Sequence, residues 1–172
     1  MELSKIKEHY SRYVRNQTIF EVNRELVKIL VTLKPVSVFE FGCNTGFNLD
    51  LLLHELGCVV YGIDLSPNAI DQGRKMYKLR IDLGDEFSLG LIRPNSFSLS
   101  FTCSVLNHLP DETVNNVINN LKAISKDHVL LVESQFDKAE RWFKHNYENW
   151  GFKKISTVRQ KPPDHDYDYW LL

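Results

Sequence analysis

The chain has 172 residues, of which 43% are hydrophobic and 12% aromatic, so it can bury the core of one domain and has little left for a second. Lys and Arg together number 21 against 22 Asp and Glu, and the cationic residues are scattered along the chain. The sequence therefore lacks the cluster of basic residues that binds a nucleic-acid backbone or an anionic membrane. We therefore expect a small molecule as the partner, with no nucleic acid and no membrane.

The three cysteines, Cys43, Cys58 and Cys103, are odd in number and lack CxxC spacing. Neither a disulfide framework nor a metal site is indicated, and a reducing, cytoplasmic location is the expectation. The first fifteen residues are charged from Glu2 onward, and no apolar run is long enough to span a bilayer. We expect neither a signal peptide nor a membrane anchor.

Apolar residues at helical spacing begin at Ile19 and end before Pro35, with Asn23, Glu25 and Lys28 at the polar positions between them. This pattern predicts an amphipathic helix that leads into the first strand. We expect one domain over residues 1–172, with the helical segment 1–35 placed beside the functional site.

The most informative segment is VSVFEFGCNTGFN at residues 36–48. Its apolar run suits a strand buried on both faces, and Glu40 near the end of that strand is costly to bury without a partner. Gly42 lets the chain turn sharply off the strand. Gly46 lets backbone approach a ligand at the start of the following helix, where free N–H groups favour an anion.

Strands and helices then alternate along the chain. The expected helices are 47–56, 67–77, one from Asp111 to about Ile124, and one over 136–150 that ends at Gly151; the expected strands are 58–64, 78–83, 97–103 and 128–132. The tail, 152–158 and 167–172 around a Pro162-Pro163 turn, predicts an antiparallel hairpin. The fold class expected is α/β, doubly wound, with a mostly parallel seven-stranded sheet and an antiparallel carboxyl-terminal hairpin.

Four motifs in order resemble the class I S-adenosylmethionine-dependent methyltransferases, in particular their small Rossmann-like domains. The segment EFGCNTG at residues 40–46 is similar to the family's glycine loop, and Asp64 stands where its ribose-binding acid ends the second strand. Gly84-Asp85 resembles its adenine-proximal acid, and the segments SFSL at 96–99 and VLNHL at 105–109 resemble its fourth strand and the loop after it. The resemblance covers 36–133 well and the remainder in outline.

Asp64 also follows the loop by about twenty residues, the separation at which a second-strand acid reaches the ribose in dinucleotide folds. A simple helix-capping role, shared with Ser66, is the alternative for Asp64. Asp85 and Glu86 have solvated loop acids as their alternative, and Cys103 has core packing. The resemblance implies S-adenosylmethionine as the cofactor, held by Glu40, Gly42, Cys43, Asn44, Gly46, Asp64, Leu65, Asp85, Glu86 and Cys103.

Candidates for the methyl acceptor's side of the site come from less diagnostic segments. His108 follows the fourth strand, where an imidazole could take a proton from the acceptor, although a structural turn residue is the simpler interpretation. Tyr10 and Tyr13 could form an aromatic wall over the site, and exposed aromatics on a terminal segment are the equal alternative.

The function expected is transfer of the methyl group of S-adenosylmethionine to an oxygen or nitrogen of a small molecule by in-line displacement. One alternative is a non-catalytic nucleoside-binding partner subunit or sensor. A second is a NAD(P)-binding oxidoreductase, which Asn44 disfavours because it stands where the G-x-G-x-x-G loop needs glycine. The carboxyl-terminal edge strands also leave room for a homodimer.

Overall fold

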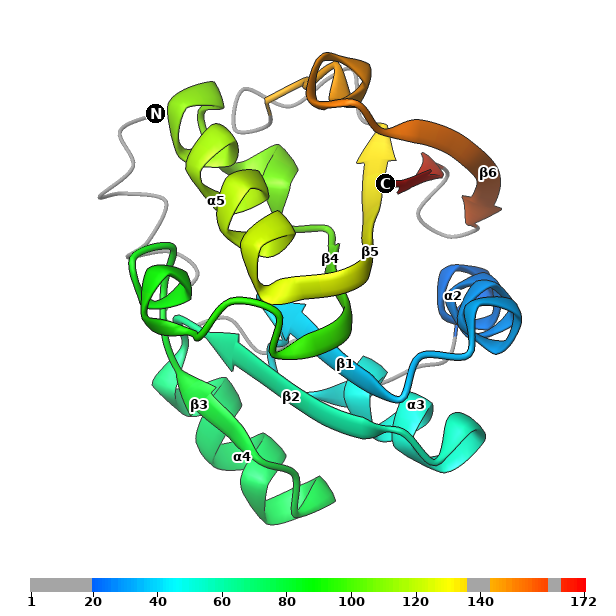
Figure 1. Ribbon diagram of the computed structural model, residues 1–172. Coiled ribbons are helices and arrows are strands. Elements are labelled where there is room, and N and C mark those ends of the chain that lie inside the picture. The colour runs from blue at the N-terminus through cyan, green and yellow to red at the C-terminus, as the bar shows by residue number, and fades with distance from the viewer. Residues whose placement is uncertain (1–19, 136–142, 161–164) are drawn as a thin grey trace.

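The computed structural model describes residues 20–135, 143–160 and 165–172 (Figure 1). Tyr10 and Tyr13, and most of the amino-terminal segment expected beside the site, lie outside the described residues.

The described chain forms a seven-stranded sheet in the order β3-β2-β1-β4-β5-β7-β6 (Figure 1). The strands are β1 Ser37–Phe41, β2 Val59–Asp64, β3 Ile81–Leu83, β4 Phe97–Cys103, β5 Ser125–Gln135, β6 Lys153–Gln160 and β7 His165–Leu171. Strands β1 to β5 pair in parallel, and β7 pairs antiparallel with β5 and with β6. The predicted doubly wound α/β sheet with an antiparallel carboxyl-terminal hairpin is confirmed.

Helices cover both faces of this sheet. On one face lie α2 Glu21–Leu33, α3 Phe47–Leu56 and α4 Pro67–Tyr77, and on the other lies α5 Asp111–Ile124. Strand β1 shows how the two cores separate, because Val38 packs into the α2 and α3 side and Phe39 packs into the α5 side. Successive side chains of a strand point to opposite faces, so the almost continuous apolar run of β1 supplies both cores.

Several predicted elements differ in extent from those observed. Strand β3 begins at Ile81 because Lys78 adopts a left-handed conformation (φ 56°) that ends α4. Strand β5 is eleven residues long and continues past Val132 to Gln135. The helix predicted over 136–150 is wrong in its described part, where Tyr147–Trp150 is a short 3₁₀ helix, η3, capped by the Asn146 side chain.

The position of Asn23 also corrects the prediction. Its place between apolar residues suggested the solvent-facing side of α2, but its side chain is 2% exposed. Asn23 accepts a hydrogen bond from the backbone N–H of Phe20 and bonds a second buried amide on α3, which satisfies its polar atoms inside the protein.

No helix among the described residues is long and apolar enough to cross a membrane.

Candidate functional site

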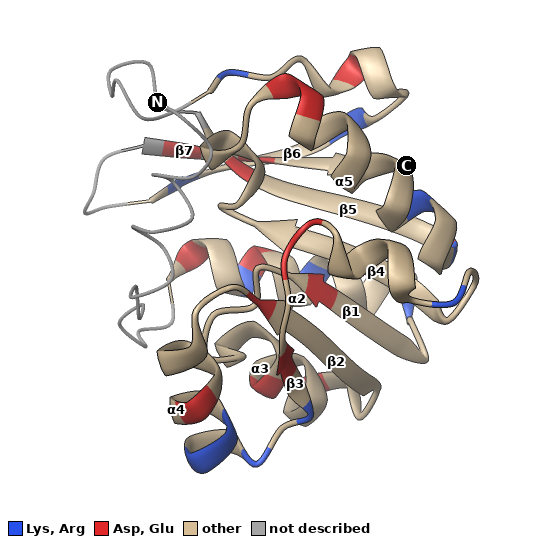
Figure 2. Cartoon of the chain, turned by 90° about the vertical axis from the view of Figure 1, so that its left-hand side faces the viewer, with Lys and Arg blue, Asp and Glu red and all other residues tan. Residues whose placement is uncertain are grey.

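The carboxyl ends of the parallel strands meet at one edge of the sheet. Phe41 at the end of β1 is in register with Ile63 of β2 and Thr102 of β4, and Asp64 is in register with Leu83 of β3. Figure 2 shows acidic residues gathered at this edge. Open α/β sheets bind ligands in the crevice outside these ends, so the geometry brings the predicted motifs to one place.

The glycine loop joins β1 to α3 and contains three left-handed residues. Gly42 has φ 75°, Asn44 has φ 50° and Gly46 has φ 82°. The backbone N–H groups of Gly42 and Cys43 both donate to the Ile63 carbonyl, at 2.9 and 3.0 Å, which fastens the loop to the end of β2. A side chain at Gly42 would be crowded as well as strained, because its Cβ would lie 2.4 Å from Val105 Cγ2.

Two further glycines outside the loop make room for it. A Cβ at Gly62 in β2 would lie 2.8 Å from Cys43 Cβ, and a Cβ at Gly73 in α4 would lie 2.1 Å from the Thr45 carbonyl oxygen. The loop is therefore packed directly against a strand and a helix whose residues lack side chains at the contacts. Neither position was predicted from the sequence, although a glycine inside a helix is a signal of close approach.

Asp64 fastens the loop to the helix that follows β2. Its Oδ2 accepts from the backbone N–H of Asn44 at 2.8 Å, and its Oδ1 accepts from the backbone N–H of Ser66 at 2.8 Å. The Ser66 hydroxyl in turn accepts from the N–H of Ala69 and caps α4. Burial raises the pKa of Asp64, and the two N–H groups oppose that shift. Ser66 is thus the residue that caps α4, and Asp64 supports it through the Ser66 N–H. Each carboxylate oxygen of Asp64 still has lone pairs to offer a ligand.

Glu40 precedes the same loop in β1, and Cys43 belongs to the loop. Glu40 is 1% exposed at the end of β1, and its Oε1 accepts from the Asn48 side chain at 2.7 Å. Burial raises the pKa of the Cys43 thiol well above its usual range, and the nearby carboxylates of Glu40 and Asp64 raise it further. Cys43 is therefore a buried neutral thiol that packs the loop.

The acids after β3 differ in their surroundings. The Asp85 carboxylate accepts from the backbone N–H groups of Phe87 and Ser88 and from the Ser88 hydroxyl, so it fixes the turn that leads into the 3₁₀ helix η1 Ser88–Leu91. Glu86 is buried, at 7% exposure, and Leu65 after β2 is half-buried. The hydrogen bonds of the turn account for the Asp85 carboxylate, whereas the carboxyl group that is buried is that of Glu86.

Beyond β4 the chain forms a tight turn that carries the other predicted residues. Cys103 is buried at the strand end, Ser104 adopts φ 58°, and His108 is the half-buried last residue of the 3₁₀ helix η2 Leu106–His108. The contact between Gly42 and Val105 places this turn against the glycine loop. The structure thus brings together the two loops that the sequence motifs marked.

Glu133 in β5 is a buried acid that was not predicted from the sequence. Its fully buried carboxylate accepts from the Thr102 hydroxyl at 2.7 Å and from the backbone N–H of Val105 at 3.1 Å, and so holds the turn after β4. Burial raises the pKa of Glu133 to about 7, and the hydrogen bonds limit that rise. The signal was an acid at the end of a buried apolar run, as with Glu40.

The comparison with protein families agrees with this geometry. The family model described as a methyltransferase domain matches residues 38–128, which is more than half of the 172-residue chain. The chain belongs to the methyltransferase domain family. The match begins in β1 and ends in β5, so it contains the glycine loop, Asp64 and the turn after β4.

Solved methyltransferase structures share the fold. Magnesium protoporphyrin IX methyltransferase from Synechocystis PCC 6803, with bound S-adenosylhomocysteine, superposes with a TM-score of 0.70 at 17% identity and covers 88% of this chain and 81% of its own. A didemethyltoxoflavin N1-methyltransferase from Burkholderia thailandensis gives 0.68 at 15%, covering 87% and 76%. A SAM-dependent methyltransferase from Aquifex aeolicus gives 0.63 at 14%, covering 99% and 98%.

At these identities the likeness shows a common architecture, that of the class I S-adenosylmethionine-dependent methyltransferases. A comparison with curated protein sequences finds no significant match.

Proposed function

We propose that this methyltransferase binds S-adenosylmethionine at the carboxyl ends of β1 to β4 and transfers its methyl group to an oxygen or nitrogen of a small molecule. The observation that carries the proposal is the placement of Asp64, whose carboxylate is fixed to the glycine loop at Asn44 and to the cap of α4 at Ser66. A carboxylate held this firmly beside a close-packed loop is preorganised for two vicinal ribose hydroxyls.

The amino-acid end of the cofactor has complementary partners at the first loop. Its carboxylate is favoured at the start of α3, where Gly46 has no side chain and the helix presents its positive end. Its ammonium group is complementary to Glu40, a buried acid at the end of β1. These assignments use both charges of the zwitterion.

The nucleoside end lies toward β2 and β3 in this proposal. Asp64 accepts from the ribose, and half-buried Leu65 offers an apolar surface to the adenine. Glu86, which is buried, is a better candidate than Asp85 for a polar contact to the base, because the Asp85 carboxylate already bonds the turn before η1. Gly42 is the proposed contact between the two ends, whereas Cys43 and Cys103 are buried in the core on the α2 and α3 side.

The reaction needs alignment more than acid–base chemistry. A lone pair of the acceptor attacks the methyl carbon, the carbon–sulfur bond breaks, and sulfur keeps the electron pair, which yields S-adenosylhomocysteine. Because the sulfonium is a good leaving group, the protein's tasks are to hold acceptor and methyl in line and to exclude water. The turn after β4, fixed by Glu133 and in contact with Gly42, supplies a rigid wall for that purpose.

His108 is the proposed base when the acceptor is a hydroxyl. It is half-buried on the turn after β4, and neutral imidazole can take the proton that the oxygen loses on methylation. An amine that attacks in its neutral form loses its proton after transfer and does not need this group. A His108→Gln variant should therefore slow hydroxyl acceptors and spare amines.

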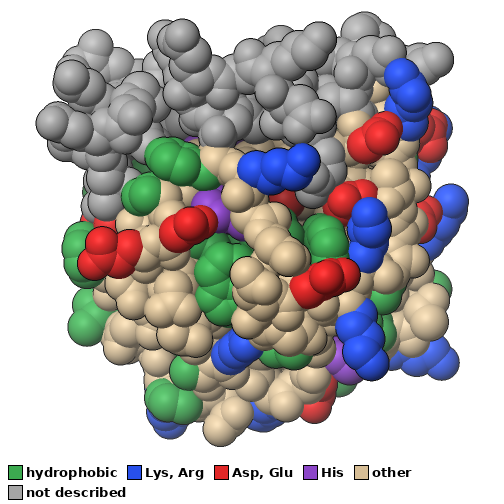
Figure 3. Space-filling model, turned by 90° about the horizontal axis from the view of Figure 1, so that it is seen from above, with side chains coloured by type: hydrophobic (Ala, Val, Ile, Leu, Met, Phe, Trp, Pro, Cys, Tyr) green, Lys and Arg blue, Asp and Glu red, His purple; other side chains and the backbone are tan. Residues whose placement is uncertain are grey.

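A small acceptor agrees with the surface charge. On the face shown in Figure 3, acidic and basic side chains of the described residues are interspersed, and neither sign forms an extended patch. Such a face offers no electrostatic attraction for a polyanion. Two structural neighbours are named for methylation of magnesium protoporphyrin IX and of didemethyltoxoflavin, which are small molecules.

The experiment is an acceptor screen with S-adenosylmethionine labelled in its methyl group, against phenols, carboxylic acids, amines and aromatic nitrogen heterocycles. We expect label in a product from at least one class, with stoichiometric S-adenosylhomocysteine and loss of activity in Asp64→Ala. Cofactor binding without label transfer to any class would favour the non-catalytic partner subunit or sensor instead.

A further inference from the structure

A line of buried hydrogen bonds joins helix α2 to the acid at the end of β1. The Asn23 side chain donates from Nδ2 to Asn48 Oδ1 at 2.7 Å, and the Asn48 side chain donates from Nδ2 to Glu40 Oε1 at 2.7 Å. Asn23 Oδ1 accepts from the backbone N–H of Phe20 at 2.9 Å. We call Asn23, Asn48 and Glu40 the amide relay.

The relay has one direction. Every donor points toward Glu40, from the Phe20 N–H through both amides to the carboxylate. A carboxylate can only accept, so it fixes the orientation of the Asn48 amide, and that orientation fixes the Asn23 amide. Aligned hydrogen bonds of this kind polarise one another and are strengthened by the terminal charge.

The relay is set into an apolar layer. Asn23 is 2% exposed, Asn48 is 7% and Glu40 is 1%. Their neighbours on α2 and α3 include Val22, Leu26, Leu49 and Leu52, all fully buried. Burying an amide or a carboxylate costs free energy even when it is hydrogen-bonded, and well-packed apolar groups would serve stability as well. The amide relay therefore indicates a role beyond folding.

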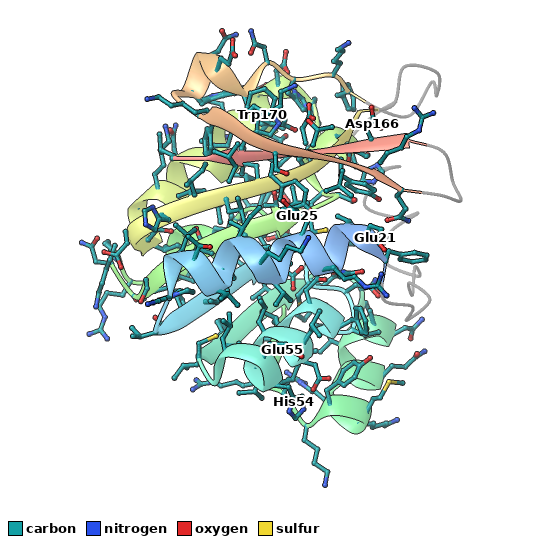
Figure 4. All side chains as sticks on the ribbon, turned by 90° about the vertical axis from the view of Figure 1, so that its right-hand side faces the viewer. Glu21, Glu25, His54, Glu55, Asp166 and Trp170 are labelled. Carbon is teal, nitrogen blue, oxygen red and sulfur yellow. The ribbon has the colours of Figure 1, made fainter. Side chains whose placement is uncertain are left out.

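Helix α2 gives the relay a fixed starting point. The Tyr169 hydroxyl donates to the Val22 carbonyl at 2.5 Å, and the Ser156 hydroxyl donates to Glu25 at 2.8 Å, so α2 is tied to β7 and β6 within two residues of Asn23. Figure 4 shows α2 lying across the sheet between α3 and the carboxyl-terminal strands, with Glu25 on the side of those strands. Asn48 lies in the first turn of α3, directly after the glycine loop.

We propose that Asn23 and Asn48 are positioning residues that hold the Glu40 carboxylate toward the ammonium group of the cofactor's amino-acid end. The relay takes one carboxylate oxygen of Glu40, fixes the plane of the carboxylate, and connects recognition of the ammonium to helix α2. This inference rests on the proposed function, because it assumes a cofactor that carries an ammonium group. The nucleoside end of the cofactor does not contact the relay.

The test uses two ligands and two variants. The ligands are S-adenosylhomocysteine and its analogue in which hydrogen replaces the amino group, both measured by isothermal titration. Asn23→Asp keeps the size of the side chain and the acceptor for Phe20, but it removes the donor to Asn48 and so turns the Asn48 amide oxygen toward Glu40. Asn48→Ala removes the donor to Glu40 outright. Asn116→Asp, at an exposed position on α5, is the control with the same change of charge.

We expect both variants to bind S-adenosylhomocysteine at least tenfold more weakly than the wild type and to bind the deaminated analogue with affinity within twofold of the wild type. Thermal unfolding and circular dichroism verify that the variants are folded. Unchanged affinity for S-adenosylhomocysteine, or an equal loss for both ligands, would overturn the relay's role. Failure of the wild type itself to bind S-adenosylhomocysteine would instead overturn the proposed function.

Discussion

The Thr102 hydroxyl donates a 2.7 Å hydrogen bond to Glu133, and both side chains are fully buried between β4 and β5. This pair, with the Val105 N–H, fixes the turn after β4 to the neighbouring strand. The same burial raises the pKa of Glu133 from 4.5 to about 7, so a group that is ionised in the unfolded chain is half protonated near neutral pH in the folded chain.

The first prediction concerns the pH dependence of stability. Between pH 4.5 and pH 7 the folded chain binds more protons at Glu133 than the unfolded chain, so the free energy of unfolding should fall as pH rises through this range. The contribution is at most about 3.5 kcal/mol, from roughly 1.4 kcal/mol per pKa unit. Glu133→Gln cannot ionise and should flatten this part of the curve in urea titrations at pH 5 and pH 8. The exposed Glu112→Gln is the control, and parallel curves for Glu133→Gln and wild type would count against the prediction.

The second prediction concerns the contact between Gly42 and Val105. Gly42→Ala places a Cβ 2.4 Å from Val105 Cγ2 and forces alanine to φ 75°, so the two loops must separate. We expect destabilisation of about 2–4 kcal/mol, from the left-handed backbone and the overpacking together, and at least tenfold weaker cofactor binding. Adding Val105→Ala removes the clash and leaves the backbone strain.

The double variant Gly42→Ala/Val105→Ala should therefore be more stable than Gly42→Ala in chemical unfolding. It should also bind the cofactor more tightly than Gly42→Ala in isothermal titration. Strict additivity of the two single changes would show that the contact does not carry the effect.

The third prediction separates helix propensity from packing at Gly73. Alanine normally stabilises a helix interior by about 1 kcal/mol relative to glycine. Here a Cβ would lie 2.1 Å from the Thr45 carbonyl oxygen, so Gly73→Ala should push the glycine loop away from α4, lower the melting temperature and weaken cofactor binding. Gly90→Ala, which meets nothing within 4 Å, is the matched control and should leave both quantities unchanged. A Gly73→Ala protein more stable than wild type would refute the packing argument.

The fourth prediction distinguishes two roles of Asp64. Because its carboxylate holds the N–H groups of Asn44 and Ser66, Asp64→Ala should weaken cofactor binding even if it never touches the ribose. A ribose contact adds selectivity, so the wild type should prefer S-adenosylhomocysteine over its 2′-deoxy analogue by at least tenfold, about 1.4 kcal/mol. Asp64→Ala should lose this preference. If the preference survives the substitution, Asp64 only supports the loop.

Predictions from the sequence were most accurate where local pattern decides structure. The strand at 97–103 and the helix 111–124 were predicted with their observed bounds, because apolar periodicity and the boundary residues agree there. The glycine loop and Asp64 were placed at adjoining strand ends because the carboxyl ends of parallel strands meet at one edge. These motifs are short-range features of the chain.

Residues that depend on distant partners could not be predicted in the same way. Asn23 was predicted to lie on the polar face of its helix, because the sequence does not show that its hydrogen-bond partner is Asn48, 25 positions away. The partner of Glu133, Thr102, is likewise 31 positions away. In the described part of the helix expected at 136–150, the His145 ring is hydrogen-bonded to the Leu106 carbonyl at 2.9 Å and to Asp111 at 2.7 Å. These contacts replace the predicted helix there. In each case tertiary hydrogen bonds outweigh the local pattern.

Isothermal titration of the wild-type protein with S-adenosylmethionine and S-adenosylhomocysteine, with NAD as the comparison ligand, tests most directly whether the site binds the proposed cofactor. We expect saturable one-site binding of both sulfur nucleosides and no binding of NAD. Binding of NAD in place of the sulfur nucleosides, or binding of none of the three, would contradict this expectation.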